Sequence, residues 1–191
     1  MSSHVYGERR DLQARRTDTV EKLLDAGLAE LVAVGHEALT VRTVATRAGV
    51  SPATAYTYLA SKNHLFAELF WQHLARDAEH RPEGDDTLAR VRSVTRRMAT
   101  QLAAHPELAA AVTPALLSSD PDVERLRLRI GGEFVRRFTE ALGPGADPAV
   151  LETLVLAFSG ALLQAGMGLM TYTEMGERLD VVVATILRGT P

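Results

Sequence analysis

Residues 40–62 read TVRTVATRAGVSPATAYTYLASK and predict two short helices joined by a tight turn. Thr40 can cap the first helix, whose apolar residues recur at helical spacing. Gly49 suits the left-handed residue that ends such a helix. Ser51 is a good N-cap for the second helix, and Pro52 fits its first position because that N–H would be unpaired anyway. Helices this short need a third to pack on, and the pattern is typical of a helix-turn-helix.

The second helix has surface chemistry that suits the DNA major groove. Ala53, Thr54 and Thr57 are small, so the helix can lie close to base edges. Threonine offers a hydroxyl group and also a methyl group that can contact thymine. Tyr56 and Tyr58 carry phenolic hydroxyls that can reach phosphate oxygens. The pattern therefore predicts a reading helix.

Lys62 lies beside a predicted helix start, because Ser61 is a good N-cap for the next helix. A lysine next to the free N–H groups of a helix N-terminus is suited to binding phosphate. The alternative interpretation of the whole segment is a tight helical corner without any DNA contact. In either case we expect Tyr58 and Leu59 to pack in the core.

Residues 15–75 resemble the DNA-binding domain of the TetR family of transcriptional regulators. The matching residues are Arg15-Arg16, Ala26-Gly27, Gly35, Leu39 to Ala45, Ala48 to Ser51, Thr54 to Leu59, Ser61-Lys62 and Leu65-Phe66. The chain departs from the family pattern at Leu59, where phenylalanine is usual, and at Asn63-His64, where a lysine or glutamate and a small residue are common. The first departure alters core packing slightly, and the second affects only the exposed start of the fourth helix.

The motif and the resemblance together indicate which residues contact DNA. The expected DNA-binding residues are Arg15, Arg16, Thr40, Arg42, Thr43, Ser51, Pro52, Ala53, Thr54, Tyr56, Thr57, Tyr58 and Lys62. The two-fold symmetry of a dimer would present two reading helices to a pseudo-palindromic operator in double-stranded DNA.

The rest of the chain also predicts helices, since no segment shows the alternation of a strand. We expect an all-α protein of about nine helices, with an N-terminal three-helix helix-turn-helix domain and a C-terminal helical domain that binds ligand and forms a dimer. The expected divisions are a flexible arm over 1–14, a DNA-binding domain over 15–62, a connecting helix over 62–81, and the effector-binding and dimerisation domain over 82–191. The expected helices outside the motif are 17–34, 62–80, 87–104, 106–117 with an interruption at Pro114, 121–142, 148–170 and 173–187.

Composition narrows the classes of protein further. The chain has no cysteine, which excludes disulfides and thiolate metal sites. Its start lacks the apolar core of a signal peptide, and no apolar run is judged long enough to span a membrane, so we expect a cytoplasmic protein. The net charge of −3 divides into +1 for residues 1–62 and −4 for the remainder. Phosphate contact therefore depends on a local basic rim rather than on overall charge.

The helix predicted from Pro148 is apolar nearly all round, so it must be buried on more than one side. The resemblance implies that the last two helices pair with their copies in a homodimer, and the alternative is a core within one chain. The expected dimer contacts are Leu151, Leu154, Val155, Phe158, Leu162, Leu179, Val182, Val183 and Ile186.

The resemblance also implies an effector pocket in the C-terminal domain. Methionines and aromatic residues suit a deformable apolar cavity for a lipophilic small molecule. The candidate lining residues are Trp71, Met98, Leu102, Val112, Leu116, Phe134, Phe138, Phe158, Leu162 and Met167. The alternative for each of these residues is an ordinary place in the core.

The function expected from the sequence is a dimeric repressor that a lipophilic effector releases from its operator. A non-specific architectural DNA-binding protein is the first alternative, although it would not need a large apolar second domain. A helical enzyme is the second, and it lacks a phosphate loop and zinc spacing. His73, Asp77 and His80 share a helix face, but an exposed polar stripe is the better interpretation. No catalytic residue, metal ligand or cofactor is therefore expected.

Overall fold

The structure, a computed structural model, describes the backbone of residues 2–77 and 79–189 and the side chains from Arg15 onward within those ranges. Its helices are α1 (Ser2–Ala38), α2 (Val41–Ala48), α3 (Pro52–Tyr58), α4 (Lys62–Arg76), α5 (Thr87–Ala104), α6 (Pro106–Leu117), α7 (Pro121–Leu142), α8 (Pro148–Gly166) and α9 (Tyr172–Arg188). The described ranges contain no strand, so the predicted all-α fold with an N-terminal helix-turn-helix domain and a C-terminal helical domain is confirmed.

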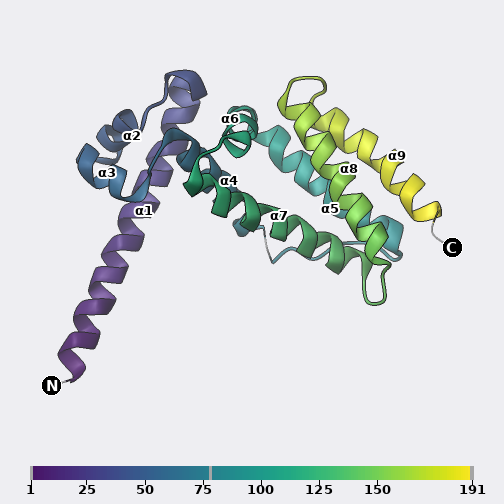
Figure 1. The fold of residues 1–191 in the computed structure, drawn as a ribbon, viewed down its shortest axis with the longest axis horizontal. Coiled ribbons are helices and arrows are strands. Elements are labelled where there is room, and N and C mark those ends of the chain that lie inside the picture. The colour runs from purple at the N-terminus through teal and green to yellow at the C-terminus, as the bar shows by residue number, and fades with distance from the viewer. Residues whose placement is uncertain (1, 78, 190–191) are drawn as a thin grey trace.

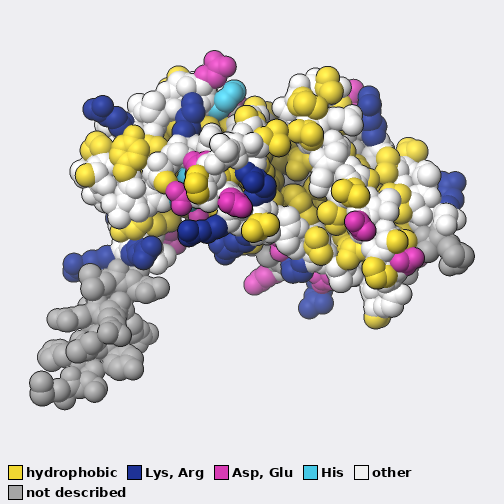
Figure 2. Space-filling view, in the orientation of Figure 1, with side chains coloured by type: hydrophobic (Ala, Val, Ile, Leu, Met, Phe, Trp, Pro, Cys, Tyr) yellow, Lys and Arg dark blue, Asp and Glu magenta, His cyan; other side chains and the backbone are white. Residues whose placement is uncertain are grey.

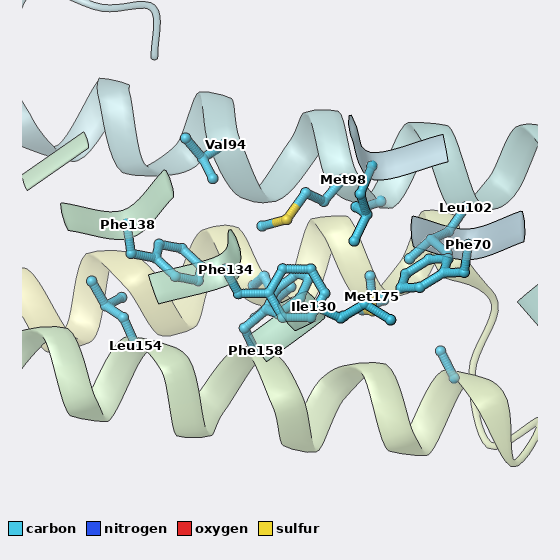
Figure 3. Close-up of a cluster of buried hydrophobic side chains, with 14 of the residues drawn as sticks. Phe70, Val94, Met98, Leu102, Ile130, Phe134, Phe138, Leu154, Phe158 and Met175 are labelled. Carbon is cyan, nitrogen blue, oxygen red and sulfur yellow. The ribbon is translucent and has the colours of Figure 1, made fainter. Parts of the chain in front are cut away.

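The helices form two lobes (Figure 1). α2 and α3 lie beside the upper part of α1 in one lobe, and α5, α7, α8 and α9 form a bundle in the other. Each lobe has its own cluster of buried apolar side chains. The bundle core is built around Phe70, Met98, Phe134, Phe138 and Phe158 (Figure 3). The two cores do not divide at one point in the sequence, because Phe70 and Leu74 of α4 lie in the bundle core and Leu108 of α6 lies in the other.

The short helix α6 contributes to both cores. Leu108, Ala111 and Ala115 are buried in the core of the helix-turn-helix lobe. Ala109 and Val112, on another side of the same helix, are buried in the core of the bundle. Since residues three and four apart share a helix face, this division follows directly from the helical period. α6 therefore joins the two lobes by apolar packing.

Three helix ends differ from the predictions. α1 begins at Ser2 rather than Thr17, so its backbone is helical through the predicted arm, whose side chains lie outside the described residues. Its geometry breaks at Gly35, as predicted, with φ 76° and ψ 167°, and one further turn follows. α4 ends at Arg76, where the Asp77 N–H bonds to the Leu74 carbonyl at 3.1 Å and tightens the last turn.

The sequence also predicted the wrong end for α8, at about residue 170. The helix ends at Gly166, because Gly168 adopts φ 76° and the Leu169 N–H returns to the Gln164 carbonyl at 3.0 Å. This pattern is a glycine-dependent helix stop. The signal was present in the sequence as Gly168, but the long apolar run concealed it.

The sequence predicted an interruption of α6 at Pro114, but the structure shows none. The helix continues from Pro106 to Leu117 around it. Pro114 and Ala110 are both exposed, so the carbonyl group that loses its intrahelical partner lies on the solvent side of the helix, where water can bond to it. A proline is tolerated there because no buried group is left unpaired.

α8 is long and apolar enough to cross a membrane by length and composition alone. Its mean hydropathy is 1.6 over an 18-residue window, and 22% of that window is buried within the chain. The expectation that no apolar run reaches such a length was therefore wrong. Leu154 and Phe158 of this helix are buried in the bundle, while Leu156 and Leu163 remain exposed in the single chain.

A buried ionic network fixes the end of α4 against α5 and α7. Asp77, Glu133 and Arg137 are each less than 9% exposed. Arg97 Nε donates to both oxygens of Asp77, at 2.7 and 2.8 Å, and Arg137 Nε donates to Glu133 Oε1 at 2.8 Å. Arg137 Nη2 also donates to the Leu74 carbonyl at 2.8 Å. Each buried charge thus has an oppositely charged partner, as burial requires.

The Asp77 carboxyl illustrates the balance in this network. Burial opposes its ionisation, but the hydrogen bond and charge of Arg97 and the charge of Arg137 outweigh burial and hold the pKa of Asp77 below its usual range. A lowered pKa means that the ionised group stabilises the fold above the unfolded-state pKa of about 3.9. This contribution is lost as the pH falls through the lower pKa of the folded state.

We predict that Asp77→Asn lowers the free energy of unfolding by about 3 kcal/mol at neutral pH, because it leaves Arg137 and Arg97 short of a counter-charge. Urea unfolding followed by circular dichroism would measure the loss. Below about pH 4 the difference from wild type should shrink, since Asp77 itself becomes protonated. The matched control is Asp18→Asn, whose pair with Lys22 is exposed and should contribute under about 0.5 kcal/mol. Equal losses in the two variants would contradict the prediction.

Candidate nucleic-acid interface and effector domain

The helix-turn-helix is built by the predicted caps. Thr40 caps α2, with its hydroxyl accepting from the Thr43 N–H at 3.1 Å and the Thr43 hydroxyl accepting from the Thr40 N–H at 3.2 Å. Gly49 ends α2 at φ 68° and ψ 27°, a conformation that a β-carbon disfavours. Ser51 then caps α3 by accepting from the Thr54 N–H at 3.1 Å. The angle between α2 and α3 is therefore fixed by local sequence.

Apolar contacts hold α2 and α3 on α1. The buried residues of the two short helices are Val41, Val44, Ala45 and Ala55, which pack in one cluster with Leu23, Leu24 and Leu31 of α1. Leu59, in the position where the family usually has phenylalanine, is 2% exposed and fully in this core, as expected. Tyr58 is half-buried at the edge of the cluster rather than inside it.

The outward side of α3 is small and open. Pro52, Ala53, Tyr56 and Thr57 are exposed, and Thr54 is half-buried. The Tyr56 side chain is 50% exposed, so its phenol group is accessible from outside. The Thr57 hydroxyl donates to the Ala53 carbonyl at 3.0 Å and keeps its methyl group on the helix surface. This surface has the small profile that close approach to base edges requires.

Four of the predicted DNA-contact hydroxyls are already engaged in the caps. Thr40, Thr43, Ser51 and Thr54 bond to one another or to nearby backbone, with 2.8 Å between the Ser51 and Thr54 hydroxyl oxygens. Their first role in the structure is to set the start of each helix. Since an oxygen has two lone pairs, such a group can still accept a further hydrogen bond from outside.

A basic rim borders the reading surface. Arg15, Arg16 and Arg42 are exposed, and the Arg16 guanidinium carbon lies 6.0 Å from the centre of the Tyr58 ring. Lysine and arginine side chains are visible along the edges of this lobe in Figure 2. Arg47 is different because its Nε donates to Glu30 at 2.7 Å and thereby lowers the pKa of that carboxyl group. Arg47 therefore acts as a partner of Glu30 in this chain.

The structure gives Lys62 a partner that the sequence did not predict. Its ammonium group donates to the His36 carbonyl at 2.8 Å and to the Glu37 carbonyl at 3.1 Å. These carbonyls belong to the last turn of α1, where unpaired carbonyl groups favour a cation. Lys62 thus fastens the start of α4 to the end of α1.

The predicted effector residues mostly meet in the bundle core. Met98, Leu102, Val112, Phe134, Phe138 and Phe158 are buried there, while Trp71, Leu116 and Leu162 are half-buried at its edge. The Phe158 ring lies edge-on to Phe134 at 5.0 Å and to Phe138 at 5.8 Å (Figure 3). Met167 does not join them, because α8 has ended before it and its side chain is 55% exposed.

The larger hollows of the described chain lie outside this core. A hollow of about 680 Å³ opens at the far end of the bundle beside Leu88, Leu142 and Val150. One of about 390 Å³ lies between α8 and α9, and one of about 330 Å³ between α5 and α9. The ten predicted effector residues line none of these three. In the described chain, then, all of these residues except Met167 pack in the bundle core or against it.

The predicted exposed stripe of His73, Asp77 and His80 does not form, because α4 ends at Arg76 and Asp77 is buried. Asp77 is bound by two arginines, and His73 instead lies edge-on to His105, with 4.7 Å between ring centres. Burial, with His105 and Arg76 nearby, lowers the pKa of His73. Across the described residues, no group of three or more His, Asp or Glu side chains is placed to hold a metal ion.

The predicted dimer residues divide into two sets. Leu154, Phe158, Leu179 and Val183 are at most 2% exposed within a single chain, so they belong to the bundle core and cannot form the surface of a dimer contact. Leu151, Val155, Leu162 and Ile186 are half-buried, and Val182 is 37% exposed. The sequence predicted two apolar helices correctly but could not assign which side of each faces its own bundle.

The open side of α8 and α9 carries residues that were not among the predicted dimer contacts. Leu156 and Leu163 are exposed and lie seven residues apart on α8, and Met167 and Leu169 beyond its end and Val181 on α9 are also exposed. A spacing of four and seven residues puts Leu156, Gly160 and Leu163 on one face. That face would have been recognisable as a second apolar stripe once the first was assigned to the core.

Comparisons with known proteins agree with this architecture. Residues 23–69 match the family model described as bacterial regulatory proteins, tetR family. An uncharacterized HTH-type transcriptional regulator of Mycobacterium tuberculosis is 47% identical over 178 residues, which cover 92% of this chain and 83% of that protein. The HTH-type transcriptional repressor KstR of Rhodococcus jostii is 26% identical, over 98% of this chain and 86% of its own length.

Solved structures show the same fold at low sequence identity. A TetR transcriptional regulator from Rhodococcus sp. RHA1 superposes with a TM-score of 0.74 at 19% identity, covering 93% of this chain and all of that one. The fatty acid degradation regulator FadR from Bacillus halodurans gives a TM-score of 0.64 at 17% identity, over 86% of this chain and 97% of its own. The fold and these relatives are those of transcriptional regulators rather than enzymes. With the capped helix-turn-helix on α1 and a separate helical bundle behind it, the chain belongs to the TetR family of DNA-binding transcriptional regulators.

Proposed function

We propose that the protein is a dimeric repressor that binds a pseudo-palindromic operator and is released from it by a lipophilic small molecule. The observation that carries the proposal is the exposed reading helix α3, fixed by two caps and a glycine turn on a domain that shares α6 with a separate apolar bundle. Such sharing allows a change in the bundle core to reach the DNA-binding lobe. The relative KstR is named a transcriptional repressor, which supports repression over activation.

The DNA contacts proposed here follow the open surface of α3. Ala53 and Thr57 would approach base edges, and the exposed phenol of Tyr56 would donate to a phosphate oxygen. Arg15, Arg16 and Arg42 supply the positive charge around this surface. Phosphate contacts fix the position of the protein on the duplex, and the small residues of α3 allow its approach. The cap hydroxyls of Thr40, Thr43, Ser51 and Thr54 would contact DNA only by accepting hydrogen bonds.

The second copy would cover the open face of α8 and α9. Leu156, Leu163 and Val182 line this face, and small residues such as Gly160 permit close approach of two helices. A membrane is the other environment that an apolar helix of this length fits. The dimer is favoured because α8 already packs on α7 and α9, and because Arg178 and Gln164 stand beside the hollow between α8 and α9. Charged and amide groups fit a protein contact better than lipid.

The bundle core is the proposed effector site. Its aromatic rings and the flexible side chains of Met98 and Met175 can be displaced by an apolar ligand. The buried charges of the bundle gather at the end of α4 and are paired there, so the core itself favours a neutral ligand. The likeness in fold to a fatty acid degradation regulator supports a lipophilic effector.

The proposed mechanism is a shift between two spacings of the reading helices. Two half-sites one turn apart require the two α3 helices to lie about 34–36 Å apart. A ligand that enters the bundle core favours the conformation with more room there, and operator affinity falls if that conformation has a different spacing. The protein would act in the cytoplasm, where its operator lies.

We predict that Tyr56→Phe weakens operator binding about thirtyfold without changing stability, because each of the two copies in the dimer loses one hydrogen bond of about 1 kcal/mol. Lys62→Ala should also weaken operator binding. Unlike Tyr56→Phe, it should lower the free energy of unfolding by about 1–2 kcal/mol, because two carbonyls of α1 lose their cation. Fluorescence anisotropy with labelled operator and urea unfolding measure the two effects. Unchanged affinity in Tyr56→Phe would remove this residue from the DNA contact.

We predict that Leu156→Glu or Leu163→Glu converts the dimer to a monomer at micromolar concentration, because each copy would place an unpaired carboxylate in the interface. Light scattering after size exclusion gives the mass. Leu128→Glu on α7 is the matched control, since Leu128 is 73% exposed and lies on another helix. A dimer that persists in both α8 variants, or binding of the wild type to lipid vesicles, would contradict the proposed interface.

The function itself is tested by titrating the protein against DNA from around its own gene, with random DNA as competitor. Preference for one pseudo-palindromic segment is the expected result, and it supplies the assay for screening lipophilic effectors. Binding that ignores sequence and disappears with added salt would instead indicate a non-specific architectural protein.

A further inference from the structure

The start of α4 is bonded to the start of α7. Ser61, the N-cap of α4, donates its hydroxyl hydrogen to Asp120 Oδ2, and Asp120 is the N-cap of α7. The other oxygen of Asp120 accepts from the Asp122 N–H at 2.9 Å. One carboxylate therefore connects two helix starts that lie 59 residues apart in the sequence.

The middle of α4 is held to α7 by a cation–π contact. The guanidinium carbon of Arg129 lies 4.0 Å from the centre of the Trp71 ring. Trp71 is half-buried and packs against the bundle core, whereas Arg129 is exposed and covers its outer face. A cation this close to an indole ring is attracted to its electron-rich face.

The end of α4 is held by a buried arginine of α7. Arg137 Nη2 donates to the Leu74 carbonyl at 2.8 Å, and Arg137 Nη1 lies 3.3 Å from Asp77 Oδ2. Arg137 is 6% exposed. Separating it from α4 would leave a buried charge short of partners, which is costly.

The three contacts occur in the same order along both helices. Positions 61, 71 and 77 on α4 meet positions 120, 129 and 137 on α7. The two helices therefore run parallel and are fastened at both ends and between them. A rotation of α4 about one end would break the contact at the other, so the three contacts oppose a pivot of α4 relative to α7.

The helix-turn-helix is carried by the same end of α4. Lys62, next to Ser61, bonds to the carbonyls of His36 and Glu37 in the last turn of α1. Beside the apolar packing of α6, the end of α1 is thus bonded to the start of α4, and the start of α4 is bonded to Asp120 of α7.

We propose that α4 and α7 move as one body, and that Asp120, Arg129 and Arg137 are positioning residues that set the angle between the reading helix and the α8–α9 pair. This inference rests on the proposed function, because the angle matters through the spacing of two reading helices in a dimer. The effector would then act by shifting the α4–α7 pair relative to α8 and α9. None of the three residues needs to touch DNA.

The experiment uses the absence of cysteine from the chain. Glu21→Cys on α1 and Leu128→Cys on α7 introduce two exposed sites for spin labels, one on each side of the connection. The doubly labelled chain is mixed with an excess of unlabelled chain, so that pulsed electron spin resonance measures the distance within one chain. The tested variant is Asp120→Ser, which keeps an N-cap for α7 but is too short to reach Ser61. The matched control is Asp122→Ser, which removes the same charge from the same turn.

We expect a single narrow distance distribution in the wild type and in Asp122→Ser, and a broader one in Asp120→Ser. Operator affinity should fall about fivefold in Asp120→Ser and stay within about twofold of wild type in Asp122→Ser. Arg129 is exposed, so Arg129→Gln should leave folding intact. This variant should also have a broader distance distribution than the wild type.

Two results would overturn the inference. One is a distribution in Asp120→Ser as narrow as in the wild type, even if the melting temperature falls, since that would show a merely structural contact. The other is equal broadening in both serine variants. If the wild type binds no DNA segment preferentially, the proposed function fails, while the distance distributions still decide whether α7 holds the DNA-binding lobe.

Discussion

The structure depends on the burial of both sides of α6. A domain of two short helices on α1 has little apolar surface of its own to bury, and small cores are only marginally stable. Leu108, Ala111 and Ala115 complete that core from α6, while Ala109 and Val112 complete the bundle core from the same helix. Neither lobe can lose α6 without exposing apolar surface, so the two lobes are joined by the same interaction that stabilises each.

α6 also contacts the end of α8 and the start of α9, so the last two helices depend on its position as well. The Tyr172 hydroxyl donates to the Ala109 carbonyl at 3.1 Å, and a β-carbon at Gly166 would lie 2.0 Å from the Thr113 hydroxyl oxygen. The C-terminal end of α8 thus approaches α6 as closely as only glycine permits. Helices that belong to the proposed dimer therefore contact the helix that completes the DNA-binding core. Together with the polar connections between α4 and α7, this gives two routes by which a change in the bundle can reach α3.

Local features of the sequence predicted the helix-turn-helix well because its geometry is determined locally. The caps at Thr40 and Ser51 and the turn at Gly49 depend on residues within four positions of each other. The positions that were predicted less well depend on distant residues. Met167 was expected in the pocket, but a glycine stop placed it outside, and Lys62 was expected at phosphate but lies within reach of two carbonyls of α1. Pro114 was expected to break α6, but the exposed side of that helix tolerates it.

The sequence by itself determined the helical class, the reading helix with its caps, and the existence of two apolar C-terminal helices, because periodicity and capping act over a few residues. Only the tertiary structure decided which side of α8 faces its own bundle, since an almost uniformly apolar helix has no polar face to fix its rotation. The tertiary structure alone also brought Asp77 to Arg97 and Arg137 and brought Ser61 to Asp120. Charge pairs between residues far apart in sequence have no local signature, because they form only where packing brings the helices together.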